Sequence, residues 1–136
     1  MSKSDVDQNS RIELTDPADI IKRKIRKAVT DSTSLITYDK EKRPGVSTLI
    51  DIESACTDID PDEIVENCLI KSYDTGEYKK HVADVLIQYL KPIQSKYMEL
   101  INDRVRLRKI LDDGAEKANL IASKNYKEIC KIVGFQ

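Results

Sequence analysis

The feature that most constrains the fold is a long run of apolar residues at helical spacing in the second half of the chain. From residue 78 to residue 101 they recur every three or four positions, which places them on one face of an α-helix. The apolar residues of this run are Tyr78, Val82, Val85, Leu86, Tyr89, Leu90, Ile93, Tyr97, Leu100 and Ile101. Because the 136 residues include only four Gly and four Pro, a many-turned β architecture is disfavoured. The sequence therefore predicts an all-α fold.

Two features inside this region are expected to interrupt the helices. Pro92 lacks an amide donor, so it should kink or split the long helix. Asp112-Asp113-Gly114 is expected to stop it, and the apolar spacing from Ala115 predicts a final helix that ends before Gly134. Tyr78, Tyr89 and Tyr97 lie on the apolar stripe, so we expect them to pack in the core.

The first half of the chain predicts shorter helices separated by a loop. Asp16 is expected to cap a first helix, with Pro17 at its first position. Thr30 to Gly45 is turn-prone and predicts a loop, and Val46 to about Ala55 predicts a second helix. Asp60-Pro61-Asp62-Glu63 is a capping signature that opens a short helix fading near Ile70. Before the first helix the chain is polar, and the alternation of Ile12 and Leu14 suggests a short strand.

The charge is unevenly distributed along the chain. Residues 1–45 carry ten Lys/Arg against eight Asp/Glu, residues 46–76 one against eight, and residues 77–136 twelve against eight. The segment balances are therefore +2, −7 and +4, so a polyanion can dock on the outer segments while the middle one repels it. The densest basic cluster is formed by Lys22, Arg23, Arg26 and Lys27, with Lys24 at the edge of their helix face. This cluster is either a solvated helix face or a phosphate-binding face.

The titratable and thiol residues suggest neither a metal site nor a catalytic relay. Cys56, Cys68 and Cys130 form no C-x-x-C pair and fit free thiols in a reducing compartment. His81 is the only imidazole, is expected to be exposed, and has no partner placed for a relay. The acidic residues 51–66 do not follow a calcium-loop spacing. No apolar run approaches the length of about 18 residues that a membrane span needs, and we expect no membrane partner.

A short motif at the start of the chain resembles a known family. Met1-Ser2-Lys3-Ser4-Asp5 resembles the signature loop of class I aminoacyl-tRNA synthetases, whose full form begins with a Lys before the Met. The downstream pieces resemble the C-terminal part of bacterial-type tryptophanyl-tRNA synthetases, in that family's order and spacing. These pieces are Lys27-Ala28-Val29-Thr30-Asp31, Tyr38-Asp39, Arg43-Pro44-Gly45-Val46-Ser47, Leu90-Lys91-Pro92-Ile93 and Asp113-Gly114-Ala115-Glu116-Lys117-Ala118. The resemblance spans essentially the whole chain, although Val6 stands where many relatives have Pro.

The resemblance implies a division of the chain. Residues 1–15 would form a flexible signature-loop arm of the catalytic domain, and residues 16–136 a helical bundle of the anticodon-binding type. Within that bundle, residues 115–136 would pack back on the catalytic domain. The Rossmann catalytic domain itself is expected to be absent from this chain, and Met1 to be an internal residue of a longer protein.

The resemblance also implies a role for the arm. When a carboxylate attacks the α-phosphorus of ATP, negative charge grows on the departing pyrophosphate, and a Lys on a mobile loop can follow that charge. By resemblance Lys3 is the catalytic lysine, and Ser2, Lys3 and Ser4 bind ATP. Two-step ligation of tryptophan to tRNA(Trp) would be the activity of the whole enzyme. The implied partners are ATP, Mg²⁺, tryptophan and tRNA(Trp), with a homodimer formed through the missing domain and no DNA partner.

Two interpretations of this chain remain open from sequence. As a fragment of the ligase it would be inactive alone, whereas as a stand-alone product it would be a helical RNA-binding or regulatory module without catalytic activity. The reading frame upstream of Met1 distinguishes them, since a Lys codon directly before it favours the fragment. The Val133-Gly134-Phe135 ending and the Ile- and Lys-rich helices suggest a mitochondrial-matrix form, with a bacterial cytoplasm as the alternative.

Overall fold

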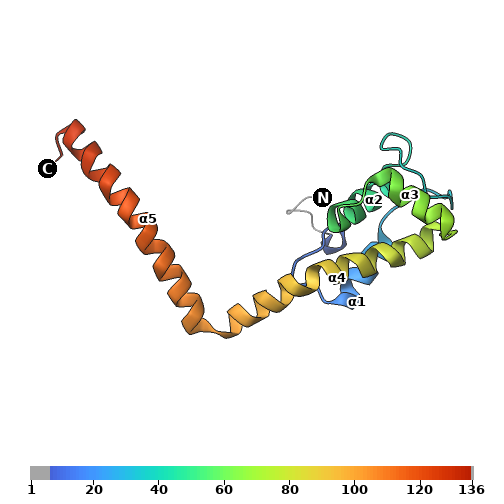
Figure 1. Cartoon of the computed structure of the whole chain (residues 1–136), viewed down its shortest axis with the longest axis horizontal. Helices are drawn as coiled ribbons and strands as arrows, with labels where there is room; N and C mark the ends of the chain where they lie inside the picture. The colour runs from blue at the N-terminus through green and yellow to red at the C-terminus, as the bar shows by residue number, and fades with distance from the viewer. Residues whose placement is uncertain (1–6, 136) are drawn as a thin grey trace. The chain divides into compact units, whose positions relative to one another are not determined.

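The structure, a computed structural model, describes residues 7–135 and consists there of helices joined by loops (Figure 1). Its elements are the 3₁₀-helix η1 (Gln8–Ser10) and the α-helices α1 (Ala18–Lys27), α2 (Pro44–Thr57), α3 (Pro61–Ile70), α4 (Thr75–Asn102) and α5 (Arg104–Val133). No strand occurs among residues 7–135, so the all-α prediction is confirmed for that part of the chain. The chain divides into unit 1, residues 1–94, and unit 2, residues 95–136.

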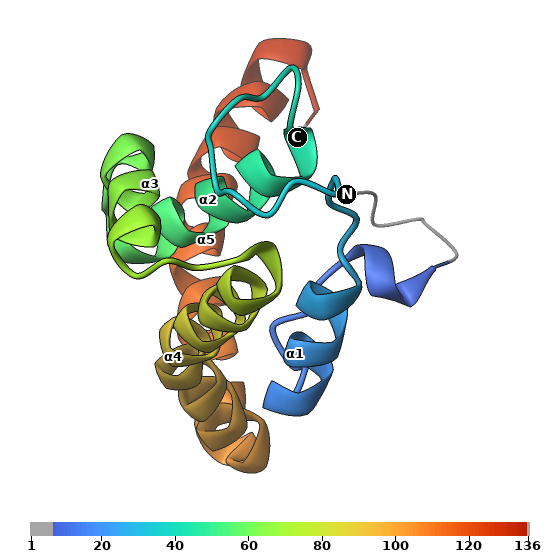
Figure 2. The ribbon, with the colours of Figure 1, turned by 90° about the vertical axis from the view of Figure 1, so that its right-hand side faces the viewer.

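Unit 1 holds the hydrophobic core. Helix α2 packs against α3, and α1 lies beside the first half of α4 (Figure 2). The buried apolar residues come from every α-helix of the unit and from the loop after α1: Ile21, Ile25, Ile36, Val46, Leu49, Ile50, Ile64, Cys68, Tyr78, Val82, Ala83 and Leu90. The apolar stripe predicted from the sequence is therefore a core face over residues 78–90 of α4.

The N-terminal boundary of α1 differs from the prediction. The helix begins at Ala18 and its N-cap is Pro17, which makes no side-chain capping bond. Asp16 is not the cap, because its carboxylate accepts hydrogen bonds from the Glu13 amide and the Lys24 ammonium instead. The short strand expected around Ile12 and Leu14 is also absent; these residues lie in an irregular segment.

The next two helices follow their sequence signals closely. Helix α2 begins at Pro44, two residues earlier than predicted, and Pro at a first helical position costs no hydrogen bond. Helix α3 begins as predicted, because the Asp60 carboxylate accepts a hydrogen bond from the Asp62 amide at 3.0 Å. It ends at Ile70, also as predicted.

The loop between α1 and α2 is organised by one arginine. The Arg43 guanidinium donates to both carboxylate oxygens of Asp31, at 3.0 and 2.9 Å. It also donates to the carbonyls of Thr33 and Leu35 and to the hydroxyl of Thr37. The bonds that Asp31 accepts, led by those from Arg43, hold the pKa of this carboxyl well below its usual range. These hydrogen bonds hold residues 31–37 of the loop in place, and Ile36 of the same segment is buried in the core.

The split predicted at Pro92 and the stop predicted at Asp112-Asp113-Gly114 do not occur. Helix α4 continues unbroken through Pro92 to Asn102, and the break falls at Asp103, whose carboxylate caps α5 by accepting from the Arg106 amide at 2.9 Å. A proline removes only one helical hydrogen bond, whereas a capping Asp supplies a partner for a new helix start. Helix α5 also runs through Gly114, since an exposed glycine costs a helix only about 1 kcal/mol. It ends as predicted at Gly134, which has a φ of 78°.

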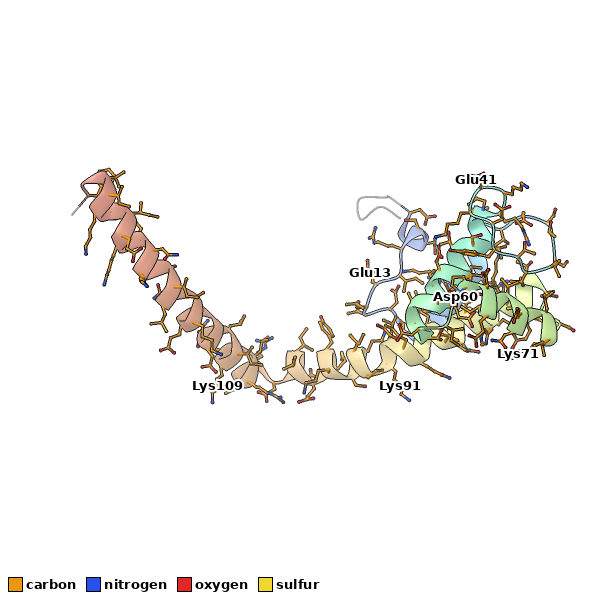
Figure 3. All side chains as sticks on the ribbon, turned by 45° about the horizontal axis from the view of Figure 1, so that its top comes forward. Glu13, Glu41, Asp60, Lys71, Lys91 and Lys109 are labelled. Atoms are coloured by element: carbon orange, nitrogen blue, oxygen red, sulfur yellow. The ribbon has the colours of Figure 1, made fainter. Side chains whose placement is uncertain are left out.

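Unit 2 has no core of its own. No residue of α5 is buried, and its side chains stand around the helix (Figure 3). The predicted burial of Tyr89 and Tyr97 is wrong, since they are 48% and 45% exposed, whereas Tyr78 is fully buried as expected. The apolar residues that recur at helical spacing along α5, such as Ile121, Ile129 and Ile132, are likewise exposed. No helix within residues 7–135 has the length and apolarity needed to cross a membrane.

Gly45 provides a stability prediction. A Cβ added there would lie 2.3 Å from the Val29 carbonyl oxygen, a backbone atom that cannot move aside cheaply. We expect Gly45→Ala to lower the free energy of unfolding by about 1–3 kcal/mol, measured by urea denaturation. The matched control is Gly114→Ala, where a Cβ meets nothing within 4 Å and helicity should rise. Equal stability of Gly45→Ala and the wild type would contradict the close approach.

Candidate functional site

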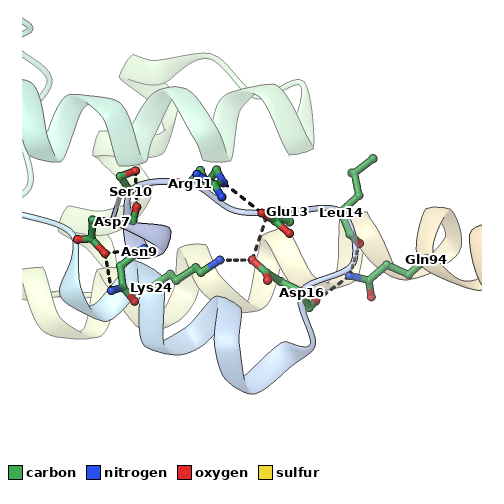
Figure 4. Close-up of polar contacts among 9 residues, drawn as sticks. All are labelled: Asp7, Asn9, Ser10, Arg11, Glu13, Leu14, Asp16, Lys24 and Gln94. Atoms are coloured by element: carbon green, nitrogen blue, oxygen red, sulfur yellow. Dashed lines mark hydrogen bonds and ion pairs between the residues drawn. The ribbon is translucent and has the colours of Figure 1, made fainter. Parts of the chain in front are cut away.

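The candidate site is the segment Asp7–Asp16, which we call the strap. It closely follows the motif that carries Ser2, Lys3 and Ser4, and those three predicted site residues lie outside the described residues. In the sequence the strap connects that motif to α1. Its contacts show how the described part of the arm, residues 7–15, is held against the helices. Figure 4 shows these contacts.

The first half of the strap is ordered by local hydrogen bonds. The Asp7 carboxylate accepts from the Asn9 amide at 2.9 Å and from the Asn9 side chain at 2.7 Å. The Ser10 hydroxyl donates to the Asp7 carbonyl at 2.8 Å. The bonds to the carboxylate, led by the one from the Asn9 backbone amide, lower the pKa of Asp7 below its ordinary value. Together these contacts order η1, which contacts α1.

The second half of the strap is bound to α1 by an ion pair. The Lys24 Nζ atom lies 2.5 Å from Asp16 Oδ2, and the two side chains are 7% and 13% exposed. The same Oδ2 accepts from the Glu13 amide at 2.9 Å, and the Asp16 amide donates to the Glu13 carbonyl at 3.0 Å. Burial opposes ionisation of Asp16, but these donors outweigh it, so its pKa lies below the ordinary value. The Asp16 carboxylate is thus ionised at neutral pH.

A glutamine from α4 completes the fixation of the strap. Gln94 Nε2 donates to the carbonyl oxygens of Leu14 and Asp16, both at 2.9 Å, across about 80 residues of sequence. A primary amide carries two N–H donors, so each carbonyl receives one. Figure 4 shows Gln94 reaching the strap where it turns toward α1.

A cavity of about 590 Å³ opens between the strap, α1 and α2. Its walls include Ile12 of the strap, Ile25 and Lys27 of α1, and Leu49 and Ile52 of α2. The size falls in the range of small-molecule sites, and the lining is mainly apolar, with polar side chains from all three elements: Asp7, Asn9 and Ser10 of the strap, Lys24 and Lys27 of α1, and Thr48 of α2.

The predicted basic cluster on α1 divides between two faces. Lys22, Arg23, Arg26 and Lys27 are exposed, as both interpretations of the sequence require. Lys24 is not at the edge of that face; it is buried, because it falls between Ile21 and Ala28 on the apolar side of the helix. Lys22 also pairs with Asp84 on α4 at 2.9 Å. The remaining cations leave an exposed basic face on the helix that holds the strap.

His81 is also placed differently from the prediction. It is half-buried, and its Nε2 atom lies 2.9 Å from Glu53 Oε1, while its ring centroid lies 5.5 Å from that of Tyr73. Glu53 is buried on α2, and its other oxygen and the Tyr78 hydroxyl have no hydrogen-bond partner among the described residues. Burial, together with the nearby Glu53, raises the pKa of Tyr78. This polar cluster inside the core was not anticipated from the sequence.

The thiols and acidic groups form no further site. Within residues 7–135 no group of three or more His, Cys, Asp or Glu side chains can hold a metal ion. All three cysteines are free, and burial raises the pKa of Cys68 to about 11, so it stays protonated at neutral pH. A thiol in that state is a poor nucleophile.

Sequence reasoning missed the two residues that bind the strap. For Lys24 a signal exists, because its spacing from Ile21 and Ala28 places it on the apolar stripe of α1, where a lysine needs a buried partner. For Gln94 there is none, since its partners are backbone carbonyls that any sequence provides. The resulting arrangement is a short segment held against a helix that has an exposed basic face.

Comparison with known proteins identifies relatives that match along this chain. The family model described as tRNA synthetases class I (W and Y) matches residues 1–91. The tryptophan–tRNA ligase of Rickettsia felis is 42% identical over 135 residues, covering 99% of this chain and 40% of the relative. That of Enterococcus faecalis is 41% identical over 134 residues, covering 98% and 39%. A crystal structure of tryptophanyl-tRNA synthetase from Mycoplasma pneumoniae matches all of this chain with a TM-score of 0.78 and 25% identity.

These matches place the helical chain in the class of the aminoacyl-tRNA synthetases. The chain belongs to the class I tRNA synthetase family of the tryptophan and tyrosine type. It spans about two fifths of the length of the curated relatives described above and 41% of the Mycoplasma pneumoniae chain.

The buried ion pair gives a prediction with a pH dependence. Removing the charge with Lys24→Met leaves Asp16 without its ammonium donor, so the free energy of unfolding at pH 7 should fall by about 1.5–3 kcal/mol. Because the folded-state pKa of Asp16 is lowered, the pair stabilises above the unfolded pKa of about 3.9 and loses this effect as pH falls through the folded pKa. Denaturation at several pH values should show the mutational loss shrinking in acid.

The matched control for this prediction is Lys22→Met on the same helix. Its pair with Asp84 is more than half exposed on both sides, so its loss should cost under about 1 kcal/mol. Equal losses for the two variants would show that the Lys24–Asp16 pair contributes no more than a surface contact.

Proposed function

We propose that this chain is the C-terminal portion of a tryptophan–tRNA ligase that activates tryptophan with ATP and transfers it to tRNA(Trp). The observation that carries the proposal is the 42% identity to a tryptophan–tRNA ligase along 99% of this chain. A second line of support is the sequence just before the strap, Met1-Ser2-Lys3-Ser4-Asp5, which resembles the signature loop.

In this proposal the loop acts on the departing pyrophosphate. The tryptophan carboxylate attacks the α-phosphorus of ATP, and the bond from that phosphorus to the bridging oxygen breaks. Lys3 stabilises the negative charge that grows on the leaving group, while Ser2 and Ser4 contribute to ATP binding. Contacts that strengthen only in the transition state raise the rate rather than the affinity. Mg²⁺ would accompany ATP as it commonly does in phosphoryl sites.

The helical region is proposed to bind tRNA. The exposed side chains of Lys22, Arg23, Arg26 and Lys27 form the candidate phosphate-binding face on α1, and residues 16–136 form the anticodon-binding region. The exposed apolar stripe of α5 supports the idea that residues 115–136 pack on the catalytic domain, because stripes of this kind are normally covered.

The remaining properties concern the whole enzyme. A Rossmann catalytic domain would be supplied by sequence preceding Met1, would hold most of the ATP site and the tryptophan pocket, and would form a homodimer. The 136-residue chain alone is then inactive, and the enzyme works in the mitochondrial matrix, or in the cytoplasm if its source is a bacterium.

The direct test uses the protein encoded by the complete reading frame. We expect tryptophan-dependent exchange of pyrophosphate into ATP, and we expect Lys3→Ala to lower its rate about 10²–10³-fold, as loss of one transition-state donor does. Lys80→Ala on α4 is the control, because this exposed side chain lies outside both the loop arm and residues 115–136, and it should retain the wild-type rate.

Three outcomes would contradict the proposal. Exchange driven by tyrosine rather than tryptophan would overturn the substrate. Unchanged turnover in Lys3→Ala would overturn the role of the loop. Exchange by the purified 136-residue chain would overturn its proposed dependence on a further domain.

The basic face of α1 gives a separate prediction. Replacing its four cations with Gln should weaken tRNA binding, and the slope of log K against log salt should become shallower by about 0.7–0.9 for each phosphate that the protein no longer neutralises. Filter binding at several salt concentrations measures this slope. The charge-matched control replaces four exposed lysines outside α1 and outside residues 115–136, namely Lys42, Lys71, Lys80 and Lys91. Equal effects of the two sets would show a general charge effect rather than a binding face.

A further inference from the structure

We propose that Gln94 is a positioning residue for the signature loop, acting through the strap rather than by touching ATP. The inference rests on the proposed function and adds a specific residue from the helical region to it. Gln94 lies on α4, far along the chain from the loop. Its side chain nevertheless donates two hydrogen bonds to the strap, one to the Leu14 carbonyl and one to the Asp16 carbonyl.

The contacts at the strap are complementary rather than redundant. Lys24 binds the Asp16 side chain, whereas Gln94 binds the Leu14 and Asp16 carbonyls. The ion pair thus fixes one side chain, and the two hydrogen bonds from the Gln94 amide fix the backbone at Leu14 and Asp16. Together they determine both the position and the direction of the segment.

The path from Gln94 to the loop is short and ordered. The turn at Glu13–Asp16 is closed by two hydrogen bonds, and Arg11 pairs with Glu13 at 3.1 Å. From there the chain enters η1, which Asp7 orders and which contacts α1. Asp7 stands four residues after Lys3 in the sequence, so the strap is the point from which the segment that carries the lysine extends. A displacement of about 1 Å at a reacting group can cost up to about 100-fold in rate.

Direct contact with substrate does not explain the geometry of Gln94. Both hydrogens of its amide nitrogen are committed to backbone carbonyls. A glutamine used for substrate recognition would keep a donor available. Its position on α4 also places it on the helix whose earlier residues, Tyr78 to Leu90, contribute to the core, so the strap is held against a firmly packed element of unit 1.

The test is a double-mutant cycle in the protein from the complete reading frame. We expect Gln94→Ala to lower kcat for ATP–pyrophosphate exchange about 10- to 100-fold while the KM for tryptophan stays unchanged. In a Lys3→Ala background the same change should have little further effect, because Gln94 acts through that lysine. A merely structural role would lower activity by the same factor in both backgrounds.

Two further variants make the result interpretable. Gln94→Glu keeps the size of the side chain but loses its donors, and it should reproduce the loss even if Gln94→Ala is poorly folded. Gln88→Ala makes the same change on α4, at a position away from the strap contacts, and should leave kcat unaltered. Amide hydrogen exchange of Glu13 and Asp16 should accelerate in both Gln94 variants but not in Gln88→Ala.

The outcomes separate this inference from the proposed function. If the wild type catalyses exchange and Lys3→Ala lowers its rate as expected, but the Gln94 variants match Gln88→Ala, only the positioning role is overturned. Additive losses in the cycle would overturn it as well. Absence of tryptophan-dependent exchange in the wild type would overturn the proposed function itself and the positioning role with it.

Discussion

The buried pairing of Lys24 with Asp16 is the interaction on which the rest of the N-terminal architecture depends. A lysine that is 7% exposed is destabilising unless a partner neutralises it, so α1 can bury its apolar side only when the strap supplies Asp16. The strap in turn loses its turn at Glu13 if Asp16 points elsewhere. Helix burial and strap position are therefore one coupled arrangement, even though they belong to different parts of the chain.

The strap is held by two helices that also contact each other. Helix α1 presents cations to solvent on one side and holds the strap on the other. Helix α4 contributes through Gln94 and through Lys79, whose ammonium donates to the Ala28 carbonyl at 2.8 Å at the end of α1. A rigid helical body behind a loop can keep a catalytic lysine within reach of its target.

Most of the fold could be predicted from the sequence because local signals agree with one another. The capping signature at Asp60 and the apolar spacing from Tyr78 to Leu90 each specify structure within a few residues. The errors arise where two local signals compete: the continuous helical pattern outweighs Pro92, and the capping ability of Asp103 outweighs the helical pattern around it. The exposure of Tyr89 and Tyr97 could not be predicted, because an apolar stripe does not reveal where its covering neighbour ends.

The candidate site was less accessible to sequence reasoning. The motif around Lys3 points to the family, but Gln94 binds backbone atoms and leaves no pattern, and Asp16 resembles a helix cap because Asp serves both roles. A distinct consequence follows from α5, whose 30 residues lack any buried side chain. Such a helix is held by its backbone hydrogen bonds and by exposed side-chain contacts such as the Asp103 cap and the Arg108–Asp112 pair, so in isolation it should lose structure gradually with heating, residue by residue from its ends. The core of unit 1 would still melt in one cooperative step, giving this single chain two melting regimes.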